Sequence, residues 1–399
     1  MLWSYATLKE GHPALFRKVE GHILRQAAMH LDDGGDSFSA VVLSSSSSSS
    51  SFFGPQALSN TMWAYATSGE GSPKLYNAVA DRIVSRGGDD LLDEYTPQSL
   101  SNLIWAYATA GVYHPGLFDT VARRVTSLVA AVRVDGDDVD PAPSSADAIA
   151  KNGAPMTTTT GRRRPGVVVG EFNHQNIANL LWSYASIGRA DGETFRAWIP
   201  VASLAVLDDG CDVRSMTSIA WAYAVADVSA PSLFGEDFAA SCLGRQDELD
   251  VEGMRQLYQW HLWQAEELGI GATGLPPSLG GACYRAFLST PPKVSALQSD
   301  VVSELEAIGL RPDCEALTKR GYRLDAIVEV EGRTIGIEVD GPSHFAGRRL
   351  TGNAALKRRQ VTGLEGIPLV SVPYWEWNAL KSDRYKKQQY LSALLGLHR

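Results

Sequence analysis

One short phrase, Trp-(Ala/Ser)-Tyr-Ala behind two or three mostly apolar residues, recurs along this chain and constrains its fold most. Copies lie at residues 2–6, 60–66, 102–108, 179–185 and 218–224. Their tryptophans are separated by 60, 42, 77 and 39 residues. The two short spacings give a period near 40, which is typical of stacked helical-hairpin repeats. The body of the protein is therefore predicted to be an α-helical repeat solenoid.

The two long spacings contain low-complexity insertions. The first insertion, near residues 32–55, includes a run of eight serines, and the second, at 133–170, is rich in Asp, Pro, Ala and Thr. Segments of such composition cannot bury enough apolar surface to fold, so we expect solvated loops. Because Met1 falls inside the first copy of the phrase, we expect the sequence to begin within a longer repeat array. Nothing about a targeting peptide follows from its start.

Each repeat unit is predicted to contain two helices. In the first, Leu100, Leu103, Ile104 and Tyr107 fall at i, i+3, i+4 and i+7, which is the apolar stripe of a helix. The second helix is expected to begin at a proline, namely Pro13, Pro73, Pro115 and Pro231. The segment 254–267 lies one period beyond Trp221 and is expected to be a degenerate sixth unit or a cap. A single hairpin cannot bury its apolar face alone, so the units should stack.

The repeated aromatic and asparagine positions have two interpretations. Aromatic side chains at fixed helical positions most often build a core, and the alternative is a platform on which nucleic-acid bases stack. Asn60, Asn102 and Asn179 each precede a tryptophan of the phrase by three residues. They either cap neighbouring backbone or face a groove.

Charge and cysteine usage limit the function classes. The net charge of −9 argues against nucleic acid at first, but residues 341–399 hold ten Lys/Arg against three Asp/Glu, whereas residues 1–340 hold 26 against 42. The four cysteines form no CxxC or Cys/His pair, so neither a structural zinc site nor a disulfide-stapled fold is predicted, and a reducing compartment is expected. No apolar run approaches 18 residues, so no membrane-spanning helix is expected.

The sequence pattern changes from residue 299 onward. A predicted helix at 300–308 is followed by two alternating runs, 322–330 and 333–340, around Glu331-Gly332. Two alternating runs joined by two such residues predict an antiparallel β-hairpin. The domain should therefore be small and of the α/β type.

This hairpin register brings carboxylates together. Pairing Val330 with Arg333 puts Asp325 opposite Glu338, with Asp340 one pleat further on the same face. Clustered like charges need a compensating cation, and Mg²⁺ or Mn²⁺ suits carboxylate oxygens. The cluster is either a divalent-metal site or a salt-bridge network. Side chains expected to neutralise such a network are Arg323, Arg348 and Lys357.

Basic and aromatic residues follow the hairpin. Five basic residues with no acidic one between them lie at Arg348, Arg349, Lys357, Arg358 and Arg359. A helix at 354–360 ending at Gly363, a strand at 367–372 and a last helix from about Ser382 are predicted. The basic residues, together with His344, Tyr374, Trp375 and Trp377, are candidate RNA contacts, because phosphates attract cations and bases stack on rings. A solvated helix face is the alternative.

Several motifs carry a resemblance to a known family. The stretch 322–377, with EVDGPSHF at 338–345, LKRR at 356–359 and PYWEW at 373–377, resembles the RAP domain, which is regarded as RNA-binding. The repeats are similar to those of octotricopeptide-repeat and FAST-kinase-like proteins. The resemblance implies an organellar factor that processes mitochondrial or chloroplast transcripts, including ribosomal RNA.

The same resemblance implies a fold similar to nucleases with the PD-(D/E)XK motif. It would make Asp325 and Glu338 metal ligands, while Asp340 stands at the third position, which is lysine in active nucleases. Lys357 is then the candidate auxiliary cation. This departure from the motif leaves catalysis open.

The predicted organisation is a helical-repeat solenoid at 1–268, a linker at 269–298 and a small restriction-endonuclease-like RAP domain at 299–399, with its core at 322–380. The leading functional hypothesis is binding of single-stranded organellar transcripts or ribosomal RNA, without membrane contact. The alternatives are a Mg²⁺- or Mn²⁺-dependent endoribonuclease acting through Asp325, Glu338, Asp340 and Lys357, and a scaffold for ribonucleoprotein partners.

Overall fold

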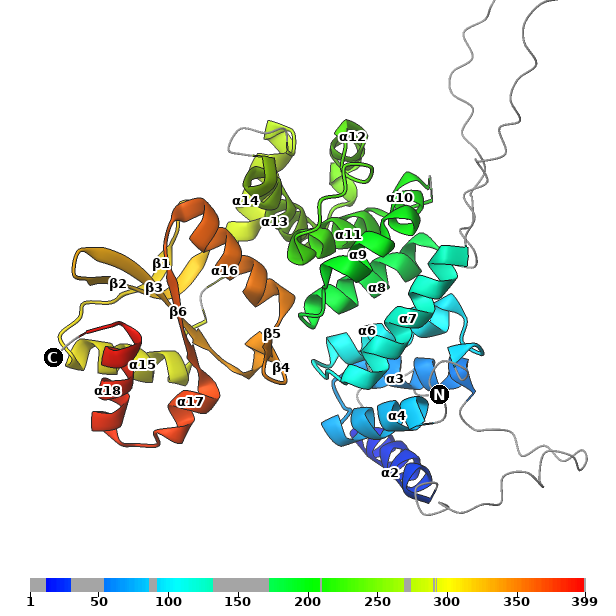
Figure 1. Ribbon diagram of the computed structural model, residues 1–399, viewed down its shortest axis with the longest axis horizontal. Helices are drawn as coiled ribbons and strands as arrows, with labels where there is room; N and C mark the ends of the chain where they lie inside the picture. Colours follow the sequence, from blue (N-terminus) through cyan, green and yellow to red (C-terminus); the bar gives the residue numbers. More distant parts are fainter. Residues whose placement is uncertain are drawn as a thin grey trace, which may run out of the picture.

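The computed structural model describes residues 12–29, 54–85, 92–131, 172–208, 210–268, 274–289, 291 and 293–397. A helical array and a small α/β domain lie side by side (Figure 1). The predicted phrase at residues 2–6 and the insertion at 133–170 lie outside the described residues, as does the insertion near 32–55 apart from residues 54 and 55.

The array consists of helical hairpins stacked in sequence order. Its helices are α2 (Pro13–Met29), α3 (Pro55–Ser68), α4 (Pro73–Ser85), α6 (Pro97–Thr109), α7 (Pro115–Ala131), α8 (His174–Ser186), α9 (Gly192–Ala197), α10 (Ile199–Leu207), α11 (Val213–Ala226), α12 (Glu236–Gly244), α13 (Val251–Leu268) and α14 (Pro277–Leu288). The first helices of the units, α3, α6, α8, α11 and α13, pack in one row, and α2, α4, α7 and α9 pack in a second. The predicted solenoid is confirmed (Figure 1).

Proline marks three of the four predicted second helices. Pro13, Pro73 and Pro115 are the first residues of α2, α4 and α7. The prediction for Pro231 is wrong, because turns follow this proline and α12 begins only at Glu236. Gly235 is extended there, with φ −80° and ψ −170°, and so separates the turn after Pro231 from the helix.

The buried tyrosines of the phrase tie successive units together. The hydroxyl groups of Tyr65, Tyr107, Tyr184 and Tyr223 donate to the backbone oxygens of Phe16, Tyr76, Phe118 and Phe195, at 2.7, 2.6, 2.6 and 3.1 Å. Each acceptor lies in the second helix of the preceding unit. All four tyrosines are at most 1% exposed. The stacking of units therefore rests on a buried ring and a directed hydrogen bond, because a buried hydroxyl needs a partner.

The array extends one helix further than predicted. The stretch 269–298, predicted to be a linker, contains α14 and the start of the next helix. Helix α14 packs against α13 and buries Leu279 and Cys283 completely. The predicted sixth unit at 254–267 lies within α13. Pro277, at the first position of α14, opens this second helix as it does in other units.

The α/β domain is built on a four-stranded sheet with the order β1-β2-β3-β6. Its elements are α15 (Ala296–Ala307), β1 (Asp313–Leu317), β2 (Arg323–Val330), β3 (Arg333–Asp340), β4 (Phe345–Ala346), β5 (Arg349–Leu350), α16 (Gly352–Glu365), β6 (Leu369–Pro373), α17 (Tyr374–Ala379) and α18 (Arg384–Leu394). The predicted hairpin and its Val330–Arg333 pairing are confirmed. Glu331 and Gly332 both have positive φ, at 51° and 75°, as a two-residue hairpin turn requires.

The two faces of the sheet have different partners. Ala326, Val328 and Ile337 form a core with α15 and α18 on one face. Helix α16 lies between the other face and the array (Figure 1). This helix passes through the predicted end at Gly363 and stops at Gly366, whose φ of 66° is the left-handed cap. The last helix begins at Arg384, two residues after the expected start. None of the described helices is long and apolar enough to span a membrane.

Candidate nucleic-acid interface

The three predicted carboxylates lie together on the face of the sheet that α16 covers. Ala326 pairs with Ile337, which places Asp325 beside Glu338 at the end of the β2–β3 ladder. The Oδ2 atom of Asp325 accepts the N–H of Val339 at 2.6 Å. Glu338 and Asp340 are only 3% and 1% exposed. The hairpin register therefore produced the predicted cluster.

Two neighbouring cations of α16 neutralise this cluster. Lys357 Nζ lies 2.7 Å from both oxygens of Glu338, although only Oε2 receives a hydrogen bond of good geometry. Arg358 donates to Asp340 Oδ2 and, at 2.9 Å, to Ser371 Oγ. Lys357 was among the predicted neutralising residues, whereas Arg358 was not. Arg323 and Arg348, which were also predicted, lie elsewhere: Arg323 donates to the backbone oxygen of Glu315 and Arg348 lies over Trp375.

The pKa values follow from burial and these partners. Burial raises the pKa of Glu338 to about 7, although the charge of Lys357 opposes this rise. Burial likewise raises the pKa of Asp325. For Asp340 burial acts in the same direction, but hydrogen bonds from His344 and Ser371 outweigh it and lower the pKa. The hydrogen bond between His344 Nδ1 and Asp340 Oδ1, at 2.8 Å, raises the pKa of His344.

The carboxylate cluster does not fit a divalent metal ion as it stands. Mg²⁺ and Mn²⁺ need several oxygen ligands that are not engaged by protein cations. Both oxygens of Asp340 already accept from His344, Arg358 or Ser371, and those of Glu338 face Lys357. In the described parts of the chain, no group of three or more His, Cys, Asp or Glu residues is arranged to hold a metal ion. The cluster is a charge-compensated network.

The third basic residue of the LKRR motif holds the domain to the array. Arg359 donates to the backbone oxygens of Ala224 and Val225, the latter at 3.3 Å, and to Glu266 at 3.4 Å. Since successive helical residues point about 100° apart, Lys357 and Arg358 reach the sheet while Arg359 reaches the array. All three cations of the motif have intramolecular acceptors. Among the predicted basic contacts, only Arg348 and Arg349 are exposed.

The predicted aromatic contacts separate into two groups. Trp377 is 1% exposed, its Nε1 donates to Asp300 at 2.7 Å, and Lys387 lies over its ring, so its prediction as an RNA contact is wrong. Tyr374 and Trp375 are half-buried and surround Phe345, with ring centroids 6.4 and 4.4 Å from it. These last three residues are called the aromatic cluster below. Arg348 lies 5.2 Å over the Trp375 ring.

A row of tryptophans runs along the first helices of the array. It comprises Trp63, Trp105, Trp182 and Trp221, and the first three are half-buried. The rings of Trp63 and Trp105 stack with centroids 6.2 Å apart and an interplanar angle of 26°. The core interpretation of the phrase therefore holds for tyrosine, whereas most of the tryptophan row is partly open to solvent.

The repeated asparagines lie beside this tryptophan row. Asn60, Asn102 and Asn179 precede their tryptophans by three residues, so they share its helix face. All three are half-buried, and within the described residues their side chains make no hydrogen bond. Within the described residues these asparagines therefore cap no neighbouring backbone, and the interpretation in which they face a groove stays a prediction.

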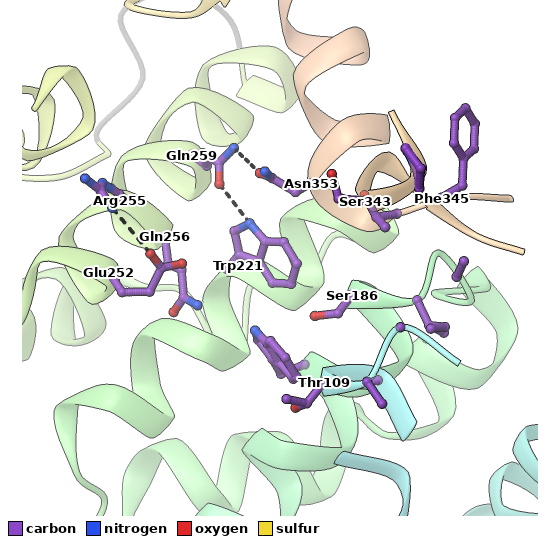
Figure 2. Close-up of a pocket in the computed structure, with 18 of the residues that line it drawn as sticks. Thr109, Ser186, Trp221, Glu252, Arg255, Gln256, Gln259, Ser343, Phe345 and Asn353 are labelled. Carbon is purple, nitrogen blue, oxygen red and sulfur yellow. Dashed lines mark hydrogen bonds and ion pairs between the residues drawn. The ribbon is translucent and has the colours of Figure 1, made fainter. Parts of the chain in front are cut away.

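Two glycines allow the α/β domain to dock closely on the array. A Cβ atom on Gly352 would lie 2.1 Å from the backbone oxygen of Ala185, and one on Gly188 would lie 2.0 Å from that of Leu350. Gln360 donates to the backbone oxygen of Gln259 at 2.8 Å. The junction encloses a cleft of about 890 Å³, lined from both sides (Figure 2). Phe345 and this cleft were not among the sequence predictions, although Phe345 belongs to the EVDGPSHF motif.

Comparison with known proteins places this domain in a family. The sequence profile described as the RAP domain matches residues 337–394, which run from β3 to α18. The chain is also similar to "RAP domain-containing protein, chloroplastic" from Oryza sativa subsp. japonica, with 37% identity over 78 residues. The match spans 19% of this chain and 12% of the rice protein. The chain is thus a helical-repeat protein that carries a RAP domain at residues 337–394.

Proposed function

We propose that this protein binds single-stranded RNA in an organelle and acts there in RNA processing, maturation or stability, including that of ribosomal RNA. The RAP domain supports a role with RNA, and the chloroplastic name of the rice protein supports an organelle. Chloroplast and mitochondrion are both compatible with this support.

The observation that carries the proposal is the half-buried tryptophan row. Trp63, Trp105 and Trp182 lie at equivalent positions on three helices that pack side by side. Every base has a flat π-face that stacks on an indole ring, and this face is accessible when the strand is unpaired. The row should therefore favour single strands over duplexes and tolerate many sequences.

Phosphate contacts are expected to be few. Of the predicted basic patch, Arg348 and Arg349 are exposed, although Arg349 also donates to the backbone oxygen of Gly188 at 3.3 Å. The LKRR cations are less exposed and have protein partners. For single strands each neutralised phosphate contributes about 0.7 to the slope of log K against log salt, so these two arginines account for a slope of about 1.4. The proposal thus relies on stacking more than on charge.

The test measures affinities of the full chain for 12-nucleotide single-stranded RNA and for the matching duplex by fluorescence anisotropy. Trp105→Ala should weaken single-strand binding, whereas Tyr385→Ala, which removes an exposed ring on α18, should leave it unchanged. Equal affinity for the duplex, or an unchanged Trp105→Ala protein, contradicts the proposal. Absence of RNA binding at low salt would favour the scaffold hypothesis.

The endoribonuclease hypothesis has one supporting feature, the position of Lys357 beside Glu338 and Asp325. The network around Asp340 leaves its oxygens engaged, so binding without cleavage is the function we favour. A denaturing gel of RNA incubated in Mg²⁺ or Mn²⁺, against EDTA, separates the two. Metal-dependent fragments that vanish with Glu338→Gln, but persist with the exposed-residue control Glu329→Gln, would establish a nuclease.

A further inference from the structure

The cleft at the junction has walls from both parts of the protein. The array contributes residues of α6, α8, α11 and α13, and the α/β domain contributes residues between Pro342 and Asn353. Figure 2 shows Trp221, Gln256 and Gln259 on the array side, with Ser343 and Asn353 opposite. Its volume of about 890 Å³ is in the range of pockets that enclose a small organic ligand.

The lining is neutral, aromatic and rich in amide groups. Trp182 and Trp221 supply indole rings, and Gln256, Gln259 and Asn353 supply amides. Its charged side chains are Arg255 and Glu252, which lie 3.8 Å apart as an ion pair (Figure 2). Such a lining does not suit a phosphate group. It suits a flat, uncharged ligand whose edge carries both hydrogen-bond donors and acceptors, as a nucleobase does.

The two glutamines of this wall differ in their hydrogen bonds. Gln259 is fully used: its Nε2 donates to the Tyr322 hydroxyl and to Asn353 Oδ1, both at 3.1 Å, and its Oε1 accepts from Trp221 at 2.9 Å. Gln256 is 6% exposed, and its Oε1 accepts only a long bond of 3.4 Å from Ser218. Its Nε2 donates to no described residue.

The free Nε2 of Gln256 is not fully enclosed by protein, so it can be reached from the cleft, where an acceptor on a ligand can take the place of water. The amide of Gln256 lines the cleft, so an acceptor on a bound ligand would supply the missing bond. Asn353, which is exposed at the opposite wall, keeps the donors of its own amide nitrogen available once its oxygen is bound by Gln259. In Figure 2 Gln256 and Asn353 lie on different sides of Trp221, so the two amides line different parts of the cleft.

The cleft also lies where two aromatic surfaces meet. Trp182 and Trp221 are members of the tryptophan row, and Phe345 belongs to the aromatic cluster; all three line the cleft. Phe345 contacts Trp375, over which Arg348 lies, so the aromatic cluster adjoins the cleft. The close contacts at Gly188 and Gly352 hold the two walls at this separation.

We infer that the cleft is a composite nucleobase pocket, which takes one unpaired base of the RNA strand lying on the tryptophan row. Trp182 provides the stacking surface, and the amide of Gln256 contacts the edge of the base, while Asn353 lines another part of the cleft. This inference rests on the proposed RNA binding and adds a site of base selectivity, which neither part of the protein forms alone.

The first experiment compares 12-nucleotide homopolymers of adenylate, cytidylate and uridylate by anisotropy. Gln256→Met keeps the side-chain length but removes the amide, so it should change the ratio of the affinities by about fivefold or more and leave the salt slope unaltered. Gln389→Met, on the exposed face of α18, is the matched control and should change neither quantity. Unchanged ratios in Gln256→Met contradict base contact by this residue.

The second experiment locates the base directly. Uridylate 12-mers containing 4-thiouridine are photocross-linked to the full chain, and the attached peptides are identified by mass spectrometry. Cross-links to peptides containing Trp182 or Asn353 are expected. Gly352→Val, which should push the domains apart at Ala185, is expected to abolish these and retain those at Trp63 and Trp105.

The possible outcomes distinguish failure of the nucleobase pocket from failure of the proposed RNA binding. If the wild-type protein binds single strands but cross-links only outside the cleft, the pocket is refuted and the proposed function stands. If the wild-type protein binds none of the homopolymers, the proposed function itself fails. Because the wild-type cross-link decides between these, the result does not depend on how well Gly352→Val folds.

Discussion

The tryptophan and the tyrosine of the repeated phrase are two residues apart and differ in their exposure to solvent. Tyr107 is 0% exposed and bonds to the preceding hairpin, whereas Trp105 is half-buried and stacks on Trp63. Two residues advance a helix by about 200°, so the two rings lie on opposite sides of it. The same phrase therefore builds the array on one side of the helix and leaves a partly exposed ring on the other.

The α/β domain shows the same division among its cations. Arg348 is exposed beside Trp375, and Arg349, although also exposed, donates to the backbone oxygen of Gly188 at 3.3 Å. Arg358 and Arg359 are engaged with the sheet and with the array. Type of residue did not decide which cations are available to a phosphate. The position of each cation relative to a buried carboxylate or carbonyl decided it, because a partly buried charge requires a partner.

Truncation of each ring to alanine tests whether the tyrosine and the tryptophan of the phrase contribute differently to stability. Tyr107→Ala should lower the free energy of unfolding by about 3–5 kcal/mol, because it removes a fully buried ring and leaves a cavity. Trp105→Ala should cost roughly 1 kcal/mol, because its ring is already in contact with solvent. Urea denaturation followed by circular dichroism measures both. Equal losses would mean that both rings are structural.

The buried network should show itself in the pH dependence of stability. Since the folded-state pKa of Glu338 is raised from 4.5 to about 7, its stabilising contribution is complete below pH 4.5 and is lost as the pH rises through 7. Glu338→Gln has no ionisable group at this position, so it does not lose this stability as the pH rises. Relative to the wild type, the variant should gain on the order of 3 kcal/mol between pH 4.5 and pH 8. Urea titrations at several pH values test this, and parallel stability curves would contradict the raised pKa.

The tryptophan and the tyrosine of the phrase should also differ in their contribution to RNA affinity. Trp105→Ala should weaken single-stranded RNA binding about tenfold, since stacking of one base on one aromatic ring contributes about 1–3 kcal/mol. Tyr107→Phe should leave affinity unchanged, because its ring stays buried. Anisotropy titrations of both variants provide the measurement. A loss of affinity in Tyr107→Phe would show that the tyrosine side of the helix also contributes to binding.

The tyrosine hydroxyl alone should have a smaller effect. Tyr107→Phe removes the 2.6 Å hydrogen bond to the Tyr76 oxygen and should cost about 1 kcal/mol of unfolding free energy. The cost is modest because Tyr76 lies inside α4, where its carbonyl also accepts a helical bond. Urea denaturation again measures it. A gain in stability would show that the buried hydroxyl group of Tyr107 destabilises the folded state.

The smallest effect concerns the exposed cations. Arg348→Ala should reduce the slope of log K against log salt by about 0.7, similarly for all RNA sequences. Arg358→Ala, by contrast, should leave the slope unchanged and instead destabilise the fold, because it leaves the buried Asp340 short of a partner. Affinity measured over a range of salt concentrations distinguishes them. If the slope falls in Arg358→Ala, this arginine also contacts phosphate.

The sequence by itself determined the features that depend on local spacing. The period of the phrase predicted the stacked hairpins, and the two-residue turn at Glu331-Gly332 predicted that Asp325 and Glu338 would be neighbours. The RAP motifs identified the C-terminal domain, which the family profile matches at 337–394. Helical and strand periodicity act over a few residues, so such predictions need no knowledge of distant contacts.

Only the tertiary structure decided which groups meet. The partners of Lys357, Arg358 and Arg359 depend on how α16 lies between sheet and array, and Trp377 is buried because α18 covers it. The cleft is formed by residues from Ala108 to Asn353, which are brought together by docking through Gly188 and Gly352. Burial and charge pairing are properties of the packed whole, because each side chain's environment comes from segments far away in the sequence.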